Sequence, residues 1–376
     1  MVSYLLKASE RNLLVLKTLG VFLMKKRNFM SLLALGLISG ATLAACGSDD
    51  SETASDSAAQ SSKTEDKFSV VMVTDVGGVD DKSFNQSAWE GMQEWGEEND
   101  KKEGTDGFKY LQSNEDSEFV TNLNSAVQAD FDVVFGIGYK LKEAMTDVSG
   151  QNEDQHFVII DDMIEAPNVA SVLFKDHEAA FLAGVAAAET TESNKIGFIG
   201  GQESDVISRF EAGFVAGVKA VNPEIDVNSE YVGSFGDAAR GKQLAAAMYS
   251  SGVDVIYQAA GDSGNGVFSE AKDLMNADES KKLWVIGVDR DQNDEGKYDT
   301  GNLTLASTLK GVGAAVKDIS NEAMAGNFAG GEVVNYGLAE GGVDLTDGNL
   351  TDEVKEKVAE YKEQIISGDI EVPQKP

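Results

Sequence analysis

The chain has 376 residues and a formal net charge of −33, with 42% apolar residues, one Cys and two His. The strong negative charge excludes a nucleic-acid-binding protein, because such proteins present a basic surface. One Cys excludes a disulfide framework, and two scattered His exclude zinc sites of familiar spacing. The apolar fraction is enough for ordinary globular cores, and the length favours two or three domains.

Residues 1–45 are predicted to be a signal peptide with an over-extended start, since Met24 is the natural first residue of this pattern. Lys25-Lys26-Arg27 precede a short apolar run that ends at Leu43-Ala44-Ala45-Cys46. Such a sequence is typical of a signal peptide and not of a membrane span. Its last four residues resemble a bacterial lipobox, so Cys46 is expected to be lipidated and to begin the mature protein. The alternative is a free Cys beside an ordinary signal peptide.

Residues 46–66 are predicted to be this lipidated Cys and a disordered tether. After Cys46 the segment consists mainly of Ser, Ala, Asp and Glu, and it offers almost nothing that could be buried. About twenty flexible residues would reach roughly 25 Å. A tether of this length would hold an anchored protein clear of the membrane surface.

The remainder of the chain alternates strand and helix patterns, which favours parallel sheets covered by helices. Strands are predicted at residues 68–74, 133–136, 157–160, 171–174, 196–200, 253–258 and 283–288. Helices are predicted from residue 84 and at residues 119–128, 178–189, 209–221, 241–250 and 267–275. Continuous apolar runs such as residues 157–160 are typical of strands buried on both faces.

About 300 residues of this kind are too many for one ordinary doubly wound sheet, so two similar lobes are predicted. Lobe 1 would span residues 67–190 and be completed by part of about 305–330. Lobe 2 would span residues 191–304 and be completed by part of about 331–376. No polar linker separates the two, and direct strand crossings between lobes suit a hinged cleft.

The stretch 73–86, VTDVGGVDDKSFNQ, joins the first predicted strand to the helix that begins at Phe84. Open α/β sheets bind ligands in loops of this kind. Asp75 offers a hydrogen-bond acceptor, Phe84 a flat ring, and Asn85 an amide that both donates and accepts. These groups suit a neutral, flat, polyhydroxylated ligand better than an anion. An acidic surface loop with a core Phe has the same pattern and is the alternative.

This stretch resembles the opening signature of the basic membrane protein family, the PnrA-like lipoproteins. Further segments are similar to that family in the expected order: FVIIDD (157–162), SRFEAGF (208–214), GSFGDAARG (233–241), QAAGDSGNG (258–266), IGVDRDQ (286–292) and STLKGV (307–312). Together with the lipobox they cover essentially the whole mature chain.

The resemblance implies a periplasmic-binding-protein type I fold. In that α/β fold each of two lobes is a parallel sheet flanked by helices, and the ligand lies in the cleft between them. It also implies a lipid-anchored protein on the extracytoplasmic face of the cell membrane. Such a protein would capture nucleosides, with purine nucleosides expected, and deliver them to an ABC permease and its ATPase. A monomer without a cofactor is expected.

The resemblance further implies that aromatic rings hold the base. Phe84 would stack on one face of a purine, and Phe210 or Phe235 would supply the partner from lobe 2. Stacking of this kind contributes about 1–3 kcal/mol per base. Phe210 has an alternative interpretation as a core residue, because it lies four residues before Phe214.

The other candidates would form hydrogen bonds with the ligand. Those expected at the base edge are Asp75, Asn85, Asp161 and its neighbour Asp162, and those expected around the ribose are Gly261, Asp289 and Lys310. A carboxylate suits vicinal hydroxyls because it accepts two charge-assisted hydrogen bonds. Lys310 would keep Asp289 ionised. A turn-capping Asp, a solvated Lys and a loop Gly are the structural alternatives for the ribose group.

The sequence contains no recognisable catalytic triad, metal motif or cofactor fingerprint, so an enzyme is not expected. Residues 261–266 lack the Gly-Lys-Ser/Thr ending of a phosphate-binding loop. His156 and His177 have no Ser or Cys partner at a suggestive spacing. Three rival interpretations remain open: a receptor for sugars or other small solutes on the same fold, a sensory receptor, and a nucleoside hydrolase.

Overall fold

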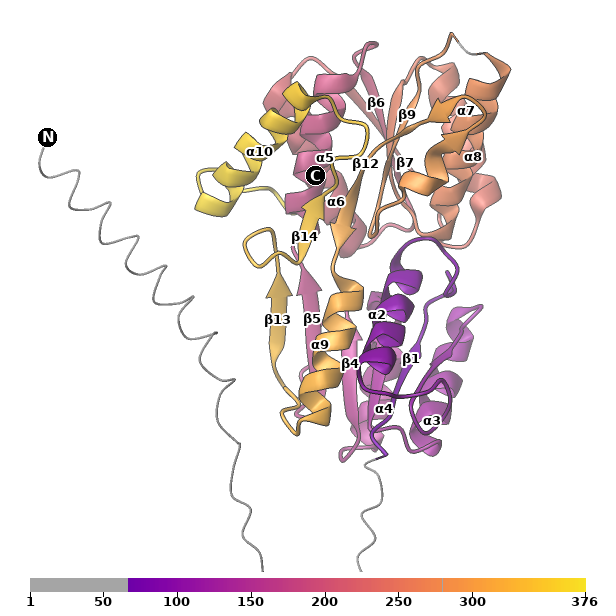
Figure 1. Ribbon diagram of the computed structural model, residues 1–376, viewed down its shortest axis with the longest axis vertical. Coiled ribbons are helices and arrows are strands. Elements are labelled where there is room, and N and C mark those ends of the chain that lie inside the picture. Colours follow the sequence, from indigo (N-terminus) through magenta and orange to yellow (C-terminus); the bar gives the residue numbers. More distant parts are fainter. Residues whose placement is uncertain (1–66, 279) are drawn as a thin grey trace, which may run out of the picture. The chain divides into compact units, whose positions relative to one another are not determined.

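The computed structural model describes residues 67–278 and 280–376. The predicted signal peptide, Cys46 and the tether therefore lie outside the described residues. The described residues contain two six-stranded sheets, with strand orders β2-β1-β3-β4-β5-β13 and β7-β6-β8-β9-β12-β14. Helices pack against each sheet, so the predicted pair of α/β lobes is confirmed (Figure 1).

Lobe 1 is built on the first sheet, in which all strand pairs are parallel. Its strands are β1 (Val70–Val73), β2 (Phe108–Leu111), β3 (Val133–Ile137), β4 (His156–Ile160), β5 (Val169–Phe174) and β13 (Val333–Tyr336). Its helices are α2 (Phe84–Glu98), α3 (Phe119–Gln128), α4 (Lys142–Gln151) and α9 (Val312–Met324), with short 3-10 turns η1 (Asp116–Glu118) and η2 (Tyr139–Leu141). The central strands β1 and β3 are buried along their whole length, as expected for a sheet covered on both faces.

Lobe 2 is built on the second sheet, which is parallel except for its edge strand β14. Its strands are β6 (Lys195–Gly200), β7 (Asp226–Tyr231), β8 (Val255–Ala259), β9 (Trp284–Gly287), β12 (Thr304–Lys310) and β14 (Val343–Leu345). Its helices are α5 (Asp176–Thr190), α6 (Asp205–Val221), α7 (Ala238–Ser250), α8 (Asp262–Ala277) and α10 (Asp352–Ser367). A 3-10 turn η3 (Asn293–Gly296) and a small hairpin, β10 (Lys297–Tyr298) with β11 (Gly301–Asn302), complete the lobe.

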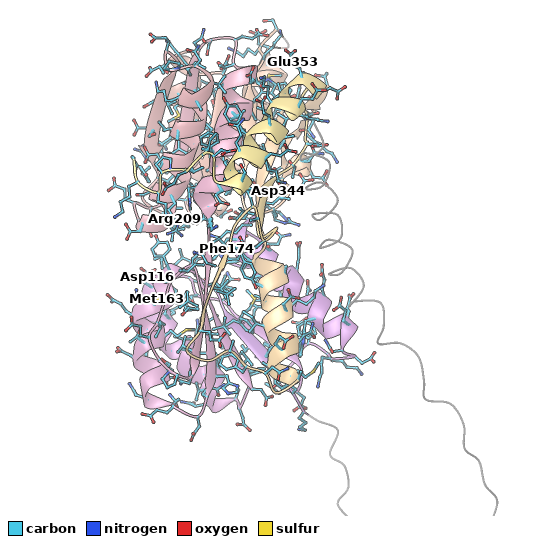
Figure 2. The ribbon with its side chains drawn as sticks, turned by 90° about the vertical axis from the view of Figure 1, so that its left-hand side faces the viewer. Asp116, Met163, Phe174, Arg209, Asp344 and Glu353 are labelled. Atoms are coloured by element: carbon cyan, nitrogen blue, oxygen red, sulfur yellow. The ribbon has the colours of Figure 1, made fainter. Side chains whose placement is uncertain are left out.

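The chain crosses between the lobes three times: from β5 to α5, from β12 to α9, and from β13 to β14. Figure 2 labels Phe174, the last residue of β5, at the level where the two lobes meet. In Figure 1, α9 of the last quarter of the chain lies beside α2 of lobe 1, and α5 lies beside α6 of lobe 2. Short crossings of this kind, clustered together, form a hinge.

These crossings differ from the predicted lobe boundaries. The prediction placed residues up to 190 in lobe 1, but α5 packs against α6 in lobe 2. A Cβ at Gly217 of α6 would come within 2.0 Å of the Phe181 carbonyl oxygen of α5, so glycine permits a close approach that fixes α5 in lobe 2. Strand β12 also belongs to lobe 2 and β13 to lobe 1. The predicted completing ranges nevertheless contain α9, which packs in lobe 1, and β14 with α10, which pack in lobe 2.

Candidate ligand-binding site

A cavity of about 520 Å³, including the space at its mouth, lies where the two lobes face each other. The carboxyl ends of the parallel strands in both sheets point toward it, which is the edge where open α/β sheets bind ligands. Nine predicted site residues line it: Asp75, Phe84, Asn85, Asp161, Phe210, Phe235, Gly261, Asp289 and Lys310.

The tenth predicted residue, Asp162, does not line the cavity. Its carboxylate accepts hydrogen bonds of 2.7 Å from both Lys142 Nζ and the Met163 N–H. Asp161 has a left-handed backbone with φ of 70°. After this turn, Asp162 lies outside the cavity lining. Asp162 is thus a surface ion-pair residue of lobe 1, and its predicted contact with the base edge is wrong.

Lobe 1 supplies a preformed acidic wall after β1. Asn85 Nδ2 donates to Asp75 Oδ1 at 2.7 Å and to Asp81 Oδ2 at 3.0 Å. Asn85 Oδ1 accepts from the Asp75 N–H at 3.3 Å. Both amide hydrogens of Asn85 are therefore used inside lobe 1, so this side chain orients Asp75. The Asp81 carboxylate accepts from the N–H groups of Ser83, Asn85 and Gln86 and caps the first turn of α2.

The carboxyl group of Asp75 is buried at the end of β1. Burial raises its pKa to about 6, against the lowering effect of hydrogen bonds from the Gly77 N–H and Asn85. Its Oδ1 accepts those two bonds, whereas Oδ2 lies near Phe84 and Gly138. Asp75 therefore presents an acceptor oxygen beside an aromatic ring in the cavity wall.

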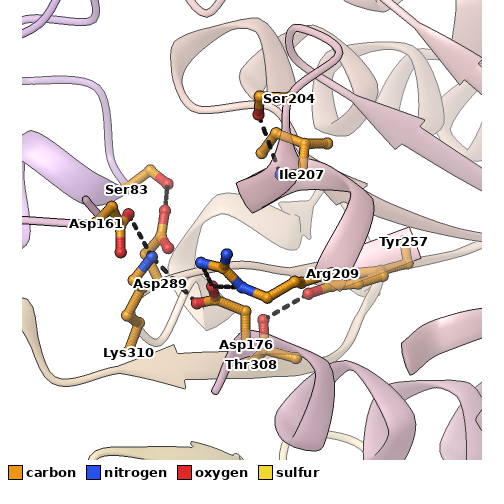
Figure 3. A network of polar contacts seen from close by, with 10 residues as sticks. All are labelled: Ser83, Asp161, Asp176, Ser204, Ile207, Arg209, Tyr257, Asp289, Thr308 and Lys310. Atoms are coloured by element: carbon orange, nitrogen blue, oxygen red, sulfur yellow. Dashed lines mark hydrogen bonds and ion pairs between the residues drawn. The ribbon is translucent and has the colours of Figure 1, made fainter. Parts of the chain in front are cut away.

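A buried ion network connects the lobes at the hinge (Figure 3). Lys310 Nζ of lobe 2 lies 2.5 Å from Asp161 Oδ2 of lobe 1 and 3.1 Å from Asp176 Oδ1. Arg209 donates to Asp176 Oδ2 from Nε at 3.2 Å and from Nη2 at 2.9 Å. Burial alone would lower the pKa of Lys310, but the charges of Asp161, Asp176 and Asp289 raise it above its ordinary value. Lys310 is therefore charged.

Asp161 and Asp289 face the cavity from opposite lobes. Burial raises the pKa of both, to about 7 for Asp289, while Lys310 opposes this rise at each. Asp289 Oδ2 accepts from Ser83 Oγ of lobe 1 at 2.5 Å. Asp161 Oδ1 is buried without a hydrogen-bond partner among the described residues. A buried acceptor left unpaired is costly, so this oxygen is a site for a donor group of a ligand.

The aromatic side chains divide into two groups. Lys310 Nζ lies 5.1 Å from the ring centroid of Phe84 and 5.6 Å from that of Phe210, both within cation–π range. Phe235 instead meets Tyr139 of lobe 1 edge to face, with ring centroids 6.3 Å apart. Aromatic rings from both lobes thus line the same cavity.

Other cavity residues were not predicted from the sequence. They are chiefly Asp81, Gly138, Tyr139, Val206 and Ile207. Gly138 and Tyr139 directly follow β3, so the strand-end rule that located Asp75 could also have located them. Val206 and Ile207 lie in the first turn of α6 and carry no chemical signal that separates them from core residues.

Two kinds of structure are absent from the described part of the chain. Residues 67–278 and 280–376 contain no cluster of three or more His, Cys, Asp or Glu side chains suited to a metal ion. Within the same ranges, none of the helices combines the length and apolar character that a membrane span requires.

Known proteins share both the sequence and the fold. The CD4+ T-cell-stimulating antigen of Listeria monocytogenes serovar 1/2a is 50% identical over 361 residues, which cover 94% of this chain and 100% of that protein. The ABC transporter nucleoside-binding protein BmpA of Lactococcus lactis subsp. cremoris is 50% identical over 359 residues, again 94% and 100% of the two chains. An ABC transporter solute-binding protein of Aeropyrum pernix K1 has a similar structure, with a TM-score of 0.71, 28% identity, and coverage of 82% of this chain and 94% of that one.

The family match extends over both lobes. Residues 68–376 match the Bmp family, described as ABC transporter substrate-binding protein PnrA-like. The predicted periplasmic-binding-protein type I fold is confirmed by the likeness to solute-binding proteins. The family consists of substrate-binding proteins and not of enzymes, and its function implies a ligand and a transporter as partners. The chain therefore belongs to the PnrA-like family of ABC transporter substrate-binding proteins, as its sequence motifs indicated.

Proposed function

We propose that this protein captures nucleosides, in particular purine nucleosides, and delivers them to the permease of an ABC importer. The observation that carries the proposal is the pairing, in one interlobe cavity, of aromatic rings with buried carboxylates, of which Asp161 Oδ1 has no hydrogen-bond partner among the described residues. The name of the 50% identical Lactococcus protein, a nucleoside-binding protein, supports the same ligand class.

The polar character of the cavity favours a ligand rich in hydrogen-bond donors. Three of its carboxylates, Asp75, Asp161 and Asp289, are acceptors when ionised, and the amide hydrogens of Asn85 are already used. The base edge and ribose hydroxyls of a nucleoside supply N–H and O–H donors. The same carboxylates repel phosphate, which favours nucleosides over nucleotides.

The aromatic side chains favour a flat base. Phe84 would stack on one face, and Phe210 or Phe235 would cover the other from lobe 2. Asp75 and Asp161 would accept from the base edge, with Asn85 holding Asp75 in place. Asp289, Gly261 and Lys310 would surround the ribose. Contacts from both lobes would then favour the closed state when ligand is bound.

The proposal includes the location of the protein. A lipid on Cys46 would anchor the chain to the extracytoplasmic face of the cell membrane, and residues 47–66 would serve as the tether. Lipid attachment would be tested by mass spectrometry of the protein extracted from membranes, with Cys46→Ser as the control. An unmodified N-terminus on the membrane-extracted protein would contradict the anchor.

Calorimetric titration tests the ligand class. The mature protein carrying Cys46→Ser, denatured and refolded to remove any bound ligand, would be titrated with purine and pyrimidine nucleosides, free bases, ribose, several sugars and a nucleoside monophosphate. We expect one-to-one binding of nucleosides, with bases, ribose and the monophosphate at least about 100-fold weaker. Binding of sugars in place of nucleosides would overturn the proposal.

A further inference from the structure

Three consecutive residues of lobe 1 form hydrogen bonds with lobe 2. Asn265 Nδ2, in the first turn of α8, donates to the Asp81 carbonyl oxygen at 3.1 Å. Gln292 Nε2, just after β9, donates to the Lys82 carbonyl oxygen at 2.8 Å. Ser83 completes the run through its bond to Asp289. Two carboxamides of lobe 2 therefore reach two neighbouring backbone carbonyls of lobe 1.

The amide of Gln292 is fixed before it meets lobe 1. Its Oε1 accepts from Gln258 Nε2 at 2.7 Å and from the Val288 N–H at 2.9 Å. A backbone N–H can only donate and a backbone carbonyl can only accept. The oxygen of the amide must therefore face Val288, and the NH₂ group must face Lys82. Gln292 is only 2% exposed, so this donor is held ready in the surface of lobe 2.

The orientation of Asn265 is determined in the same way. Its Nδ2 donates both to the Asp81 carbonyl oxygen and to Asp262 Oδ1 at 2.9 Å. The opposite orientation would place Asn265 Oδ1 against two other oxygens. In the observed orientation Oδ1 is buried without a partner among the described residues, so the NH₂ group alone makes the contacts with Asp81 and Asp262.

The lobe 1 side is rigid as well. Lys82 has a left-handed backbone with φ of 60°, a conformation that costs a non-glycine residue energy and needs support from its surroundings. That support includes the Asp81 carboxylate, which caps α2, and Gln86 Oε1, which accepts from the Lys82 N–H at 3.2 Å. The two carbonyls lie three and two residues before Phe84, so lobe closure onto them also holds the backbone that leads into the proposed stacking residue.

We propose that Asn265 and Gln292 form a carboxamide clasp, which holds the lobes closed through the carbonyls of Asp81 and Lys82 and thereby slows ligand release. Neither Asn265 nor Gln292 lines the cavity in the described structure, so the clasp acts without touching the ligand. In the open state water replaces both bonds, so each contributes modestly. A modest clasp still permits the opening that delivery to a permease requires.

The test compares clasp variants with a matched carboxamide within one lobe. Gln202 Nε2 donates to the Gly233 carbonyl at 3.1 Å, inside lobe 2. Asn265→Ala, Gln292→Ala and the control Gln202→Ala would be made in the mature chain with Cys46→Ser. Fluorophores on Glu143→Cys of lobe 1 and Glu203→Cys of lobe 2, both exposed, would report the closed fraction by energy transfer.

We expect each clasp variant to lower the closed-to-open ratio about fivefold, the usual effect of one net hydrogen bond. Its release rate for guanosine and adenosine should rise by a similar factor while the association rate changes less than about twofold. Gln202→Ala should change neither quantity. Clasp variants that match Gln202→Ala in closed fraction and release rate would overturn the proposal.

Two features keep the outcome decisive. Gln292→Ala removes the acceptor of the Gln258 and Val288 hydrogen bonds and could unfold lobe 2. Asn265→Ala leaves those bonds intact. Thermal unfolding would identify a misfolded variant. The release-rate measurement rests on the proposed nucleoside binding, but the closed fraction of the ligand-free protein does not. Absence of nucleoside binding by the unaltered protein would therefore refute the proposed function, while the energy-transfer ratios would still decide the clasp.

Discussion

The two lobes share a strand order, and this makes their cavity-facing ends directly comparable. β2-β1-β3-β4-β5 in lobe 1 corresponds to β7-β6-β8-β9-β12 in lobe 2. Asp161 follows β4, and Asp289 follows β9 after one further residue. Both have a left-handed backbone, with φ of 70° and 67°. Each lobe thus turns one buried carboxylate into the cleft at the same place in its sheet.

The residues that follow β1 in lobe 1 differ in character from those that follow β6 in lobe 2. After β1, lobe 1 presents Asp75 held by Asn85, a network completed inside that lobe. After β6, lobe 2 presents the apolar Val206, Ile207 and Phe210 of α6. The polar wall of lobe 1 therefore persists when the lobes separate, whereas lobe 2 adds apolar cover beside the polar groups of Asp289 and Lys310.

Lys310 of lobe 2 forms a buried ion pair with Asp161 of lobe 1. Lys310→Met would leave Asp161 buried without its cation, while Asp176 would keep only Arg209, so the free energy of unfolding should fall by about 3–5 kcal/mol. Urea titration measures this. Lys242→Met, which removes the exposed partner of Asp273, is the matched control and should cost less than about 1 kcal/mol. Equal losses in the two variants would contradict the role assigned to the network.

The buried carboxyls of the two lobes should make stability depend on pH. The folded pKa of Asp289, about 7, lies above its ordinary value of 3.8. The folded state therefore retains a proton that the unfolded chain releases, so this group's stabilisation is full below about pH 4 and is lost as the pH rises through about 7. Asp289→Asn should remove a slope of about 1.4 kcal/mol per pH unit across that window.

Asp75→Asn tests the pH dependence of stability that a buried carboxyl group of lobe 1 contributes. Because the pKa of Asp75 is raised only to about 6, its contribution should be lost at lower pH than that of Asp289. Urea unfolding at intervals between pH 4 and pH 8 would measure both slopes. Curves of unfolding free energy that run parallel for the unaltered protein and both variants would contradict these pKa shifts.

Phe84 tests whether lobe 1 also provides the stacking surface. Phe84→Ala should weaken nucleoside binding about 10- to 100-fold, because stacking contributes about 1–3 kcal/mol per base. Phe328→Ala is the matched control, since Phe328 also has one flat partner, His156, with ring centroids 4.1 Å apart. It lies outside the cavity wall. Calorimetry with guanosine and adenosine decides the point, and an unchanged affinity in Phe84→Ala would refute the stacking role.

The sequence predicted most of the site because parallel strands share one carboxyl edge. Continuous apolar runs identified β3 and β4, and residues just beyond such runs then had to face the cleft, as Asp161 does. The choice between Asp161 and Asp162 depended on the left-handed turn at Asp161. That backbone angle has no signature in a pair of identical residues, so Asp162 was wrongly included.

Elements with weak apolar patterns could not be predicted in the same way. β7 alternates exposed and half-buried residues along its whole length, and β13 is a half-exposed edge strand. Neither resembles a buried strand. The lobe to which α5 belongs is determined by its close packing against Gly217 of α6, a tertiary contact that strand and helix periodicity does not contain.

The smallest expected effect concerns an ion pair between the lobes at the surface. Arg290 Nη2 of lobe 2 lies 2.8 Å from Glu90 Oε1 of lobe 1, with side chains 28% and 42% exposed. An exposed pair contributes about 0–1 kcal/mol and is screened by salt. Arg290→Gln should therefore raise the nucleoside dissociation constant less than about fivefold at low salt. In 0.5 M NaCl the effect should nearly vanish, because salt screens exposed charges. Arg240→Gln, an exposed lobe 2 control bonded only weakly to Gln243 at 3.4 Å, should show no change at either salt concentration. A large, salt-independent loss in Arg290→Gln would mean that closure depends on this pair more than on the buried contacts.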